Sequence, residues 1–225
     1  MLHVGLLTIP GLTQLDLTGP AEVFARMPDT TVHLVWKTRE PITSHSGVTL
    51  VPSTTFADCP QLDVLCVPGG FGIAPLMSDQ EVLDFLRRQA VKARYVTSVC
   101  NGSLLLGAAG LLKGYRSACH WSMRDQLAIM GAIPVNERVV KDRNRVSGGG
   151  VTAGIDFALT LVAEIAGPEV AQAAQLTLEY APAPPFNCGT PEQAGPELAD
   201  KIRARMAPGV ATHRAAAEAA ARALA

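Results

Sequence analysis

Residues 94–109 constrain the fold more than any other part of the chain, because a strand passes there directly into a helix. Residues 95–99 are rich in β-branched and aromatic side chains and predict a short strand. Three consecutive leucines and several small residues follow, and they predict a helix that begins near Asn101. Cys100 lies at the junction. We therefore expect Cys100 above the edge of a sheet, facing free backbone N–H groups and the positive end of the helix.

Two interpretations of Cys100 are open from its position alone. The helix end would bias the thiol toward the thiolate, which attacks electrophiles, in the geometry of a nucleophile elbow that uses Cys in place of Ser. Alternatively, Cys100 is an inert core residue, because free cysteine is among the most buried residue types.

Apolar strands alternate with helices along the rest of the chain, which predicts an α/β fold with a mostly parallel sheet and helices on both faces. The expected strands are residues 2–8, 31–37, 62–67 and 95–99, with a short hairpin at 39–54 and a last strand pair at 139–147. The expected helices after the first strand are residues 20–26, 79–93, 155–166 and 169–180.

The C-terminal part differs in composition from this core. Residues 181–196 are rich in Pro and Gly and predict an extended loop, which either closes over a pocket or lies on the surface. Residues 197–225 are rich in Ala and predict a helical extension, broken at Pro208 and Gly209, that packs on the domain or on a second subunit. We expect one domain over residues 1–225, with its core at about 2–180.

Composition excludes several classes of partner. The 225 residues are 48% hydrophobic with a formal net charge of −1, so no basic surface for nucleic acid is expected. No apolar stretch reaches the ~20 residues of a membrane span, and the N-terminus is typical of a first strand rather than a signal peptide. The five cysteines are irregularly spaced without a C-x-x-C pair, so neither a disulfide framework nor a structural zinc site is expected, and the cytoplasm is the expected compartment.

Two loops at the carboxyl ends of strands carry further candidates. Asp16 lies in a loop predicted at residues 10–18, where open parallel sheets bind ligands, although such a carboxylate can also cap nearby backbone. Gly69, Gly70 and Phe71 follow the third strand, where glycines let backbone N–H groups approach a ligand. Neither nucleotide-binding glycine signature is present, so no nucleotide cofactor is expected.

His120 is the one histidine downstream of Cys100 that is near enough in sequence to be an obvious partner. It either tunes the thiol or packs against a helix or backbone carbonyl. The neighbouring Trp121, Phe71 and the 181–196 loop are candidates for the pocket wall, and ordinary packing is the alternative for each.

Five motifs occur in an order and spacing that resemble the DJ-1/PfpI superfamily, which has a class I glutamine-amidotransferase-like, flavodoxin-like fold. The motifs lie at residues 16–24, 67–72, 98–102, 120–121 and 147–156, within a resemblance that covers about residues 2–180. Within the superfamily the chain looks most like the isonitrile hydratases, which add water to R–N≡C to give a formamide. This resemblance implies Cys100 and Asp16 as the working pair, a small-molecule substrate, no cofactor or metal, and a homodimer.

Asn101 departs from the family patterns. The PfpI-type proteases place a His directly after the elbow Cys, so protease activity is not expected here. The isonitrile hydratases that this chain resembles carry Thr at this position. The amide of Asn is bulkier than the hydroxyl of Thr and offers both donors and an acceptor. We expect this change to affect substrate choice, the orientation of Cys100 or the rate.

The resemblance allows a covalent mechanism. The Cys100 thiolate would attack the isonitrile carbon, and Asp16, with its pKa raised by the nearby negative charge, would supply a proton and later act as a base. Backbone N–H groups of Gly70 and Asn101 would hold developing negative charge. Direct activation of water by Asp16 remains an alternative.

Two other functions remain open. A glyoxalase-like or deglycase-like enzyme on 2-oxoaldehydes usually pairs the thiol with a Glu and a nearby His, so Asp16 opposes this function and His120 favours it. A thiol-based sensor is the other, because an exposed elbow thiolate oxidises readily. Some motifs also occur in sensor domains of AraC-type regulators, but the ~30-residue tail is too short for their DNA-binding domain.

Overall fold

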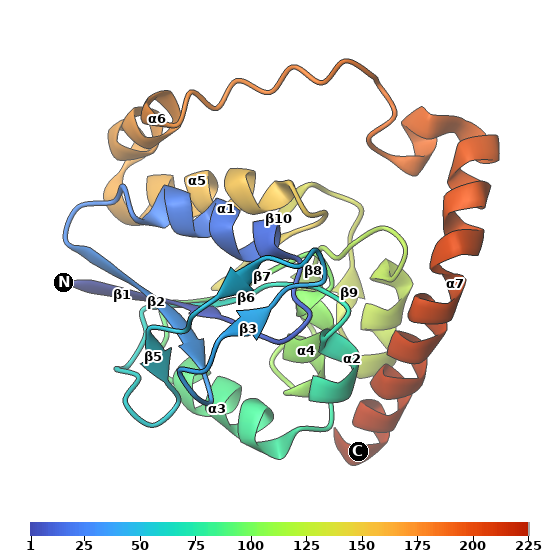
Figure 1. Ribbon diagram of the computed structural model, residues 1–225, viewed down its shortest axis with the longest axis horizontal. Coiled ribbons are helices and arrows are strands. Elements are labelled where there is room, and N and C mark those ends of the chain that lie inside the picture. The colour runs from blue at the N-terminus through green and yellow to red at the C-terminus, as the bar shows by residue number, and fades with distance from the viewer. Residues whose placement is uncertain (225) are drawn as a thin grey trace.

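Seven strands form the central sheet in the computed structural model, which describes residues 1–224 (Figure 1). The sheet order is β10-β11-β7-β6-β1-β2-β5, and every neighbouring pair is parallel except β10 with β11. The strands are β1 (Leu2–Leu7), β2 (Thr30–Trp36), β5 (Thr54–Thr55), β6 (Val64–Val67), β7 (Tyr95–Val99), β10 (Val139–Asp142) and β11 (Arg145–Gly148). The predicted α/β class with a mostly parallel sheet is confirmed.

Helices cover both faces of this sheet (Figure 1). On one side lie α1 (Gln14–Phe24), α5 (Ala153–Ala166) and α6 (Pro168–Thr177). On the other lie α2 (Ile73–Leu76), α3 (Gln80–Ala90), α4 (Gly102–Ala108) and the 3₁₀ helix η1 (Arg124–Met130). Short strand pairs β3 (Ile42–Thr43) with β4 (Thr49–Leu50), and β8 (Arg116–Ser117) with β9 (Ile133–Pro134), complete the core, and the first pair confirms the predicted hairpin.

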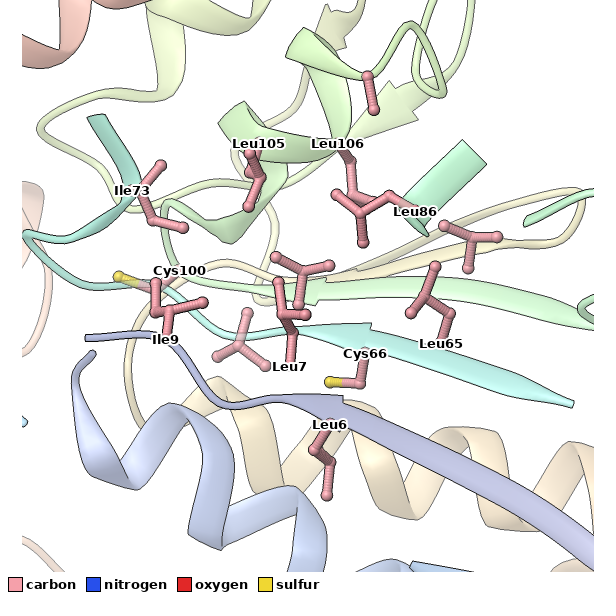
Figure 2. Packing of buried hydrophobic residues seen from close by; sticks show 14 of the residues in the cluster. Leu6, Leu7, Ile9, Leu65, Cys66, Ile73, Leu86, Cys100, Leu105 and Leu106 are labelled. Carbon is pink, nitrogen blue, oxygen red and sulfur yellow. The ribbon is translucent and has the colours of Figure 1, made fainter. Parts of the chain in front are cut away.

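The central strands are buried on both faces because helices cover each side. All four residues of β6 are buried, as expected for a parallel strand in the middle of a two-sided sheet. Successive side chains point to opposite faces, so Leu6 points toward α1 while Leu7 lies on the α4 side (Figure 2). Phe24 of α1 meets Phe157 of α5 edge to face, which joins the two helices above the sheet.

The first helix begins earlier than predicted. We expected a loop up to about residue 18, but α1 starts at Gln14 and places Asp16 in its first turn. Pro20 was expected near the helix start and lies instead inside the helix. An interior proline removes one intrahelical hydrogen bond and its ring crowds the carbonyl four residues earlier, and packing of α1 against α5 outweighs that cost. Asp16 still lies just beyond the carboxyl end of β1, where it was expected.

The C-terminal segment also departs from the prediction. Residues 181–190 have no regular structure, but the following helix, α7 (Pro191–Leu224), begins within the predicted loop and continues through Pro208 and Gly209. The break lies instead at Gly195, whose φ of 77° is left-handed. Packing of α7 against α2, α4 and η1 keeps the helix intact across the proline (Figure 1). No helix within residues 1–224 is long and apolar enough to cross a membrane.

Candidate active site

Cys100 occupies a strained turn between β7 and α4. Its φ is 57°, a left-handed conformation that costs a non-glycine residue on the order of 1–3 kcal/mol and persists only when its surroundings enforce it. Two hydrogen bonds supply that constraint. The Cys100 N–H donates to the Gly148 carbonyl at 2.9 Å, and the Ser103 hydroxyl donates to the Cys100 carbonyl at 3.3 Å. The strand–turn–helix geometry predicted around Cys100 is confirmed.

Asp16 is fully buried beside the elbow. The Gly69 backbone N–H donates to its Oδ2 atom at 2.9 Å, whereas its Oδ1 atom makes no hydrogen bond within residues 1–224. Burial raises the pKa of Asp16 to about 7, although the Gly69 N–H and the neighbouring Cys100 thiol both favour the charged form. The predicted rise in this pKa is confirmed, but its cause is burial rather than repulsion by a thiolate.

The Cys100 thiol has the opposite electrostatic character from that predicted. Only 6% of the residue is exposed, and burial, followed by the negative charge of Asp16, raises its pKa well above the usual thiol value. The Asn101 backbone N–H opposes this shift without reversing it. The N-terminal end of α4 does not compensate for the loss of water, so these surroundings favour the thiol over the thiolate. The burial agrees with the second interpretation of Cys100, and these surroundings oppose the bias toward a resting thiolate that the first interpretation expects.

The glycine loop after β6 packs directly on this pair. A Cβ at Gly69 would lie 2.3 Å from Asn101 Oδ1 and 2.8 Å from Asp16 Oδ2, so only glycine fits there. The next residue, Gly70, donates its N–H to Asn101 Oδ1 at 2.8 Å, and Asn101 Nδ2 donates back to the Gly70 carbonyl at 3.1 Å. The Gly70 N–H is therefore occupied, and its predicted role as a donor to developing negative charge is not available in this arrangement.

A cavity of about 220 Å³ opens above Cys100. Its walls come from the start of α1, the β3–β4 hairpin, the glycine loop, the elbow, the segment around η1 and α7. The lining residues are Thr13, His45, Gly70, Phe71, Cys100, Asn101, His120, Met123, Val151 and Met206. Phe71 is 60% exposed at this wall and lies edge to face against His45. No Lys, Arg, Asp or Glu lines the cavity within the described chain.

His120 reaches the cavity wall, but Trp121 does not. The His120 Nδ1 atom lies 2.8 Å from the Ser122 hydroxyl, and burial lowers the pKa of its imidazole, which favours the neutral ring. Within residues 1–224 His120 makes no hydrogen bond with Cys100. Trp121 instead packs against Arg203 of α7 and lines a separate pocket. Residues of the 181–196 loop likewise line neighbouring pockets rather than this one.

His213 of α7 is a site residue that the sequence reasoning missed. It is 2% exposed, and its Nε2 atom lies 3.2 Å from Asn101 Nδ2 although 112 residues separate the two. One signal was present in the sequence: His213 shares an apolar helical face with Ala217 and Ala220, where a histidine is unusual. Met206 on the cavity wall carried no such signal. No group of three metal-ligating side chains occurs in the described chain.

The fold and the site together define an α/β protein with a cysteine at a nucleophile elbow and a buried carboxyl beside it. The DJ-1/PfpI family model matches residues 3–164. The chain belongs to the DJ-1/PfpI family, as the resemblance predicted.

Two named relatives and one crystal structure are similar to this chain over more than half of its length. The isonitrile hydratase of Pseudomonas putida is 57% identical over 222 residues, which cover 96% of this chain and 97% of that protein. The glutathione-independent glyoxalase DJR-1.2 of Caenorhabditis elegans is 26% identical over 58% of this chain and 70% of its own. A crystal structure of a ThiJ/PfpI family protein from Pseudomonas syringae superposes with a TM-score of 0.93 at 45% identity, covering 96% of this chain and 90% of that one.

Proposed function

We propose that this protein is an isonitrile hydratase, which converts R–N≡C and water into the formamide R–NH–CHO. The observation that carries the proposal is the buried Cys100–Asp16 pair beneath a small apolar cavity. Its chain is 57% identical, over nearly its full length, to a protein named for that reaction.

The cavity suits an isonitrile. This functional group is compact and linear, carries no net charge, and reacts at a terminal carbon that can approach the floor of a narrow cavity. The walls are mainly apolar and surround about 220 Å³, which accommodates a small hydrocarbon substituent. Phe71, Val151 and Met206 would contact that substituent, while Cys100 lies where the terminal carbon would arrive.

The first half of the reaction adds the thiol across the terminal carbon. As the Cys100 sulfur forms its bond to that carbon, the ionised Asp16 takes the thiol proton and then delivers it to the same carbon. The product is a thioimidate, R–N=CH–S–Cys100. A carboxyl with a pKa of about 7 is present in both protonation states near neutral pH, so it can accept and return one proton.

The second half consumes water. Asp16 removes a proton from water as the oxygen bonds to the thioimidate carbon, and the nitrogen gains a proton. When the carbon–sulfur bond breaks, the new hydroxyl loses its proton, the formamide forms and Cys100 recovers its thiol. The Asn101 backbone N–H, which favours negative charge on sulfur, assists departure of the thiol. No step requires a metal or an organic cofactor.

The test is turnover of cyclohexyl isocyanide, followed by appearance of N-cyclohexylformamide. Cys100→Ala is expected to abolish formamide production, and Asp16→Asn to lower kcat about 10²- to 10⁴-fold. Cys188→Ala changes an exposed cysteine that does not line the cavity and is the matched control with unchanged turnover. Near-normal turnover in Cys100→Ala would contradict the covalent route and leave direct attack by water.

A second candidate is glyoxalase-like chemistry on 2-oxoaldehydes. The observation in its favour is His120, which lines the same cavity as Cys100. Incubation with methylglyoxal, with lactate as the measured product, separates the two functions. Formamide without lactate supports isonitrile hydration, whereas lactate without formamide supports the second candidate.

The assembly and compartment belong to the same proposal. A homodimer is implied by the family resemblance, and large apolar side chains such as Leu176 and Phe186 are more than 70% exposed. The five cysteines are all free, which suits a reducing cytoplasm. Light scattering coupled to size-exclusion chromatography tests the dimer, with a mass of about twice 23.7 kDa as the expected result.

A further inference from the structure

The C-terminal helix places a buried histidine against the residue that follows the nucleophile. His213 Nδ1 lies 2.8 Å from the Gly209 carbonyl within α7, and His213 Nε2 lies 3.2 Å from Asn101 Nδ2. The proposed reaction uses neither His213 nor its contact with Asn101. The contact links a helix outside the 3–164 family match to the elbow itself.

The direction of each hydrogen bond in this chain follows from its ends. A carbonyl only accepts, so His213 Nδ1 carries the proton that bonds Gly209, and the neutral ring presents Nε2 as an acceptor. At the other end, the Gly70 N–H only donates, so the Asn101 atom that faces it is the amide oxygen. Asn101 Nδ2 therefore has two hydrogens to donate, and its acceptors are the Gly70 carbonyl at 3.1 Å, His213 Nε2 at 3.2 Å and, as a weaker acceptor, the Met123 sulfur at 3.6 Å.

These bonds connect His213 to the catalytic pair through a short route. Asn101 holds both polar groups of the Gly70 backbone, and the adjacent Gly69 N–H is the hydrogen-bond donor to Asp16. Asn101 also contributes the backbone N–H that faces the Cys100 sulfur. A shift of the Asn101 amide would therefore move donors to both reacting side chains.

We propose that His213 is a positioning residue, which holds the Asn101 amide against Gly70 and so fixes the donors to Asp16 and Cys100. The C-terminal helix then contributes to the active site through His213, and the effects of Asn101 and His213 on the site depend on each other. The inference deepens the proposed isonitrile hydration and rests on it wherever turnover is the measurement.

The first experiment compares His213→Phe, which keeps a ring of similar volume, with Arg214→Ala. Arg214 is the next residue of α7 and forms an ion pair with Asp125 of η1, so its loss tests helix docking without touching the elbow. We expect His213→Phe to lower kcat about 10- to 100-fold with little change in KM, and Arg214→Ala to leave both unchanged. His213→Gln, which can offer an acceptor oxygen, is expected to recover part of kcat.

A double-mutant cycle with Asn101→Thr tests the route. If His213 acts through the Asn101 amide, His213→Phe will have much less effect in the Asn101→Thr background than in the parent. The same fold-loss in both backgrounds, or no loss in the parent, would overturn the proposal.

A readout that is independent of the substrate separates this proposal from the proposed function. In a Cys188→Ala background, the rate of Cys100 alkylation by iodoacetamide is measured against pH. A shifted pH profile in His213→Phe, with the Arg214→Ala profile unchanged, supports positioning even if no isonitrile is turned over. Two results together would contradict the proposal. One is superimposable pH profiles for His213→Phe and the parent. The other is a ¹⁵N NMR spectrum in which Asn101→Thr leaves the His213 ring protonated at Nδ1 and its signals unshifted.

Discussion

Gly69 donates its backbone N–H to Oδ2 of Asp16 at 2.9 Å, while Oδ1 of the same buried carboxyl has no hydrogen-bond partner within residues 1–224. One oxygen is thus anchored and the other is free to carry a proton. An ionised carboxyl in that position is costly because burial removes its water, and the Gly69 N–H and the Cys100 thiol replace only part of that solvation. The arrangement accounts for the raised pKa of this aspartate.

The free energy of unfolding is expected to depend on pH through the ionisation of Asp16. Because burial raises the pKa of Asp16 from 3.8 to about 7, the folded state binds its proton more tightly than the unfolded state. The contribution is fully present below about pH 4 and is lost as pH rises toward 7. Asp16→Asn removes the ionisation and therefore this loss. As pH rises from about 4 to 7, the free energy of unfolding of Asp16→Asn should increase relative to that of the parent.

Urea unfolding at several pH values measures that gain. One pKa unit corresponds to about 1.4 kcal/mol, so the difference between Asp16→Asn and the parent should grow by a few kcal/mol between pH 4 and 7 and then level off. A difference that stays constant with pH would show that Asp16 titrates normally in the folded protein.

Gly69→Ala should disable the site. The added Cβ would lie 2.3 Å from Asn101 Oδ1 and 2.8 Å from Asp16 Oδ2, too close for either atom to remain in place. We expect kcat/KM to fall about 10²-fold or more and the protein to lose roughly 1–3 kcal/mol of stability. Gly189→Ala is the matched control, since its Cβ would meet only Gln193 Oε1 at 3.8 Å. Equal activity of the two variants would contradict the close packing.

Met206→Ala should change which isonitriles are accepted. Met206 reaches the cavity from α7, and its truncation enlarges the space above Cys100. We expect kcat/KM for adamantyl isocyanide, relative to that for methyl isocyanide, to rise up to about tenfold. Met27→Ala removes a buried methionine elsewhere in the core and should lower stability without altering this ratio. An unchanged ratio in Met206→Ala would place the substituent elsewhere.

Cys100 should react slowly with general thiol reagents. It is 6% exposed and its pKa is raised by burial and by Asp16, whereas Cys188 is exposed. With iodoacetamide at pH 7, peptide mass spectrometry should find Cys188 modified at least about tenfold faster than Cys100. Faster modification of Cys100 than of Cys188 would support the thiol-sensor function, which needs a readily oxidised group at the elbow.

Residues close together in the sequence were the ones whose structure could be predicted. The strand–Cys–helix junction at Cys100 and the alternation of strands with helices depend on local side-chain patterns, and both are found in the structure. The start of α1 was placed too late because Pro20 suggests a first turn, while packing against α5 stabilises a longer helix. The same kind of tertiary packing carries α7 through Pro208.

The chemistry of the site depended on distances that no local pattern contains. The sequence by itself determined the strands, the elbow and the residue types that reach it, because periodicity and backbone sterics act over a few neighbouring residues. Only the tertiary structure decided that Cys100 is a buried thiol, that burial rather than a neighbouring charge raises the pKa of Asp16, and that His213 meets Asn101. Solvation and contacts are properties of the packed chain, since they depend on what residues far apart in sequence exclude or bring together.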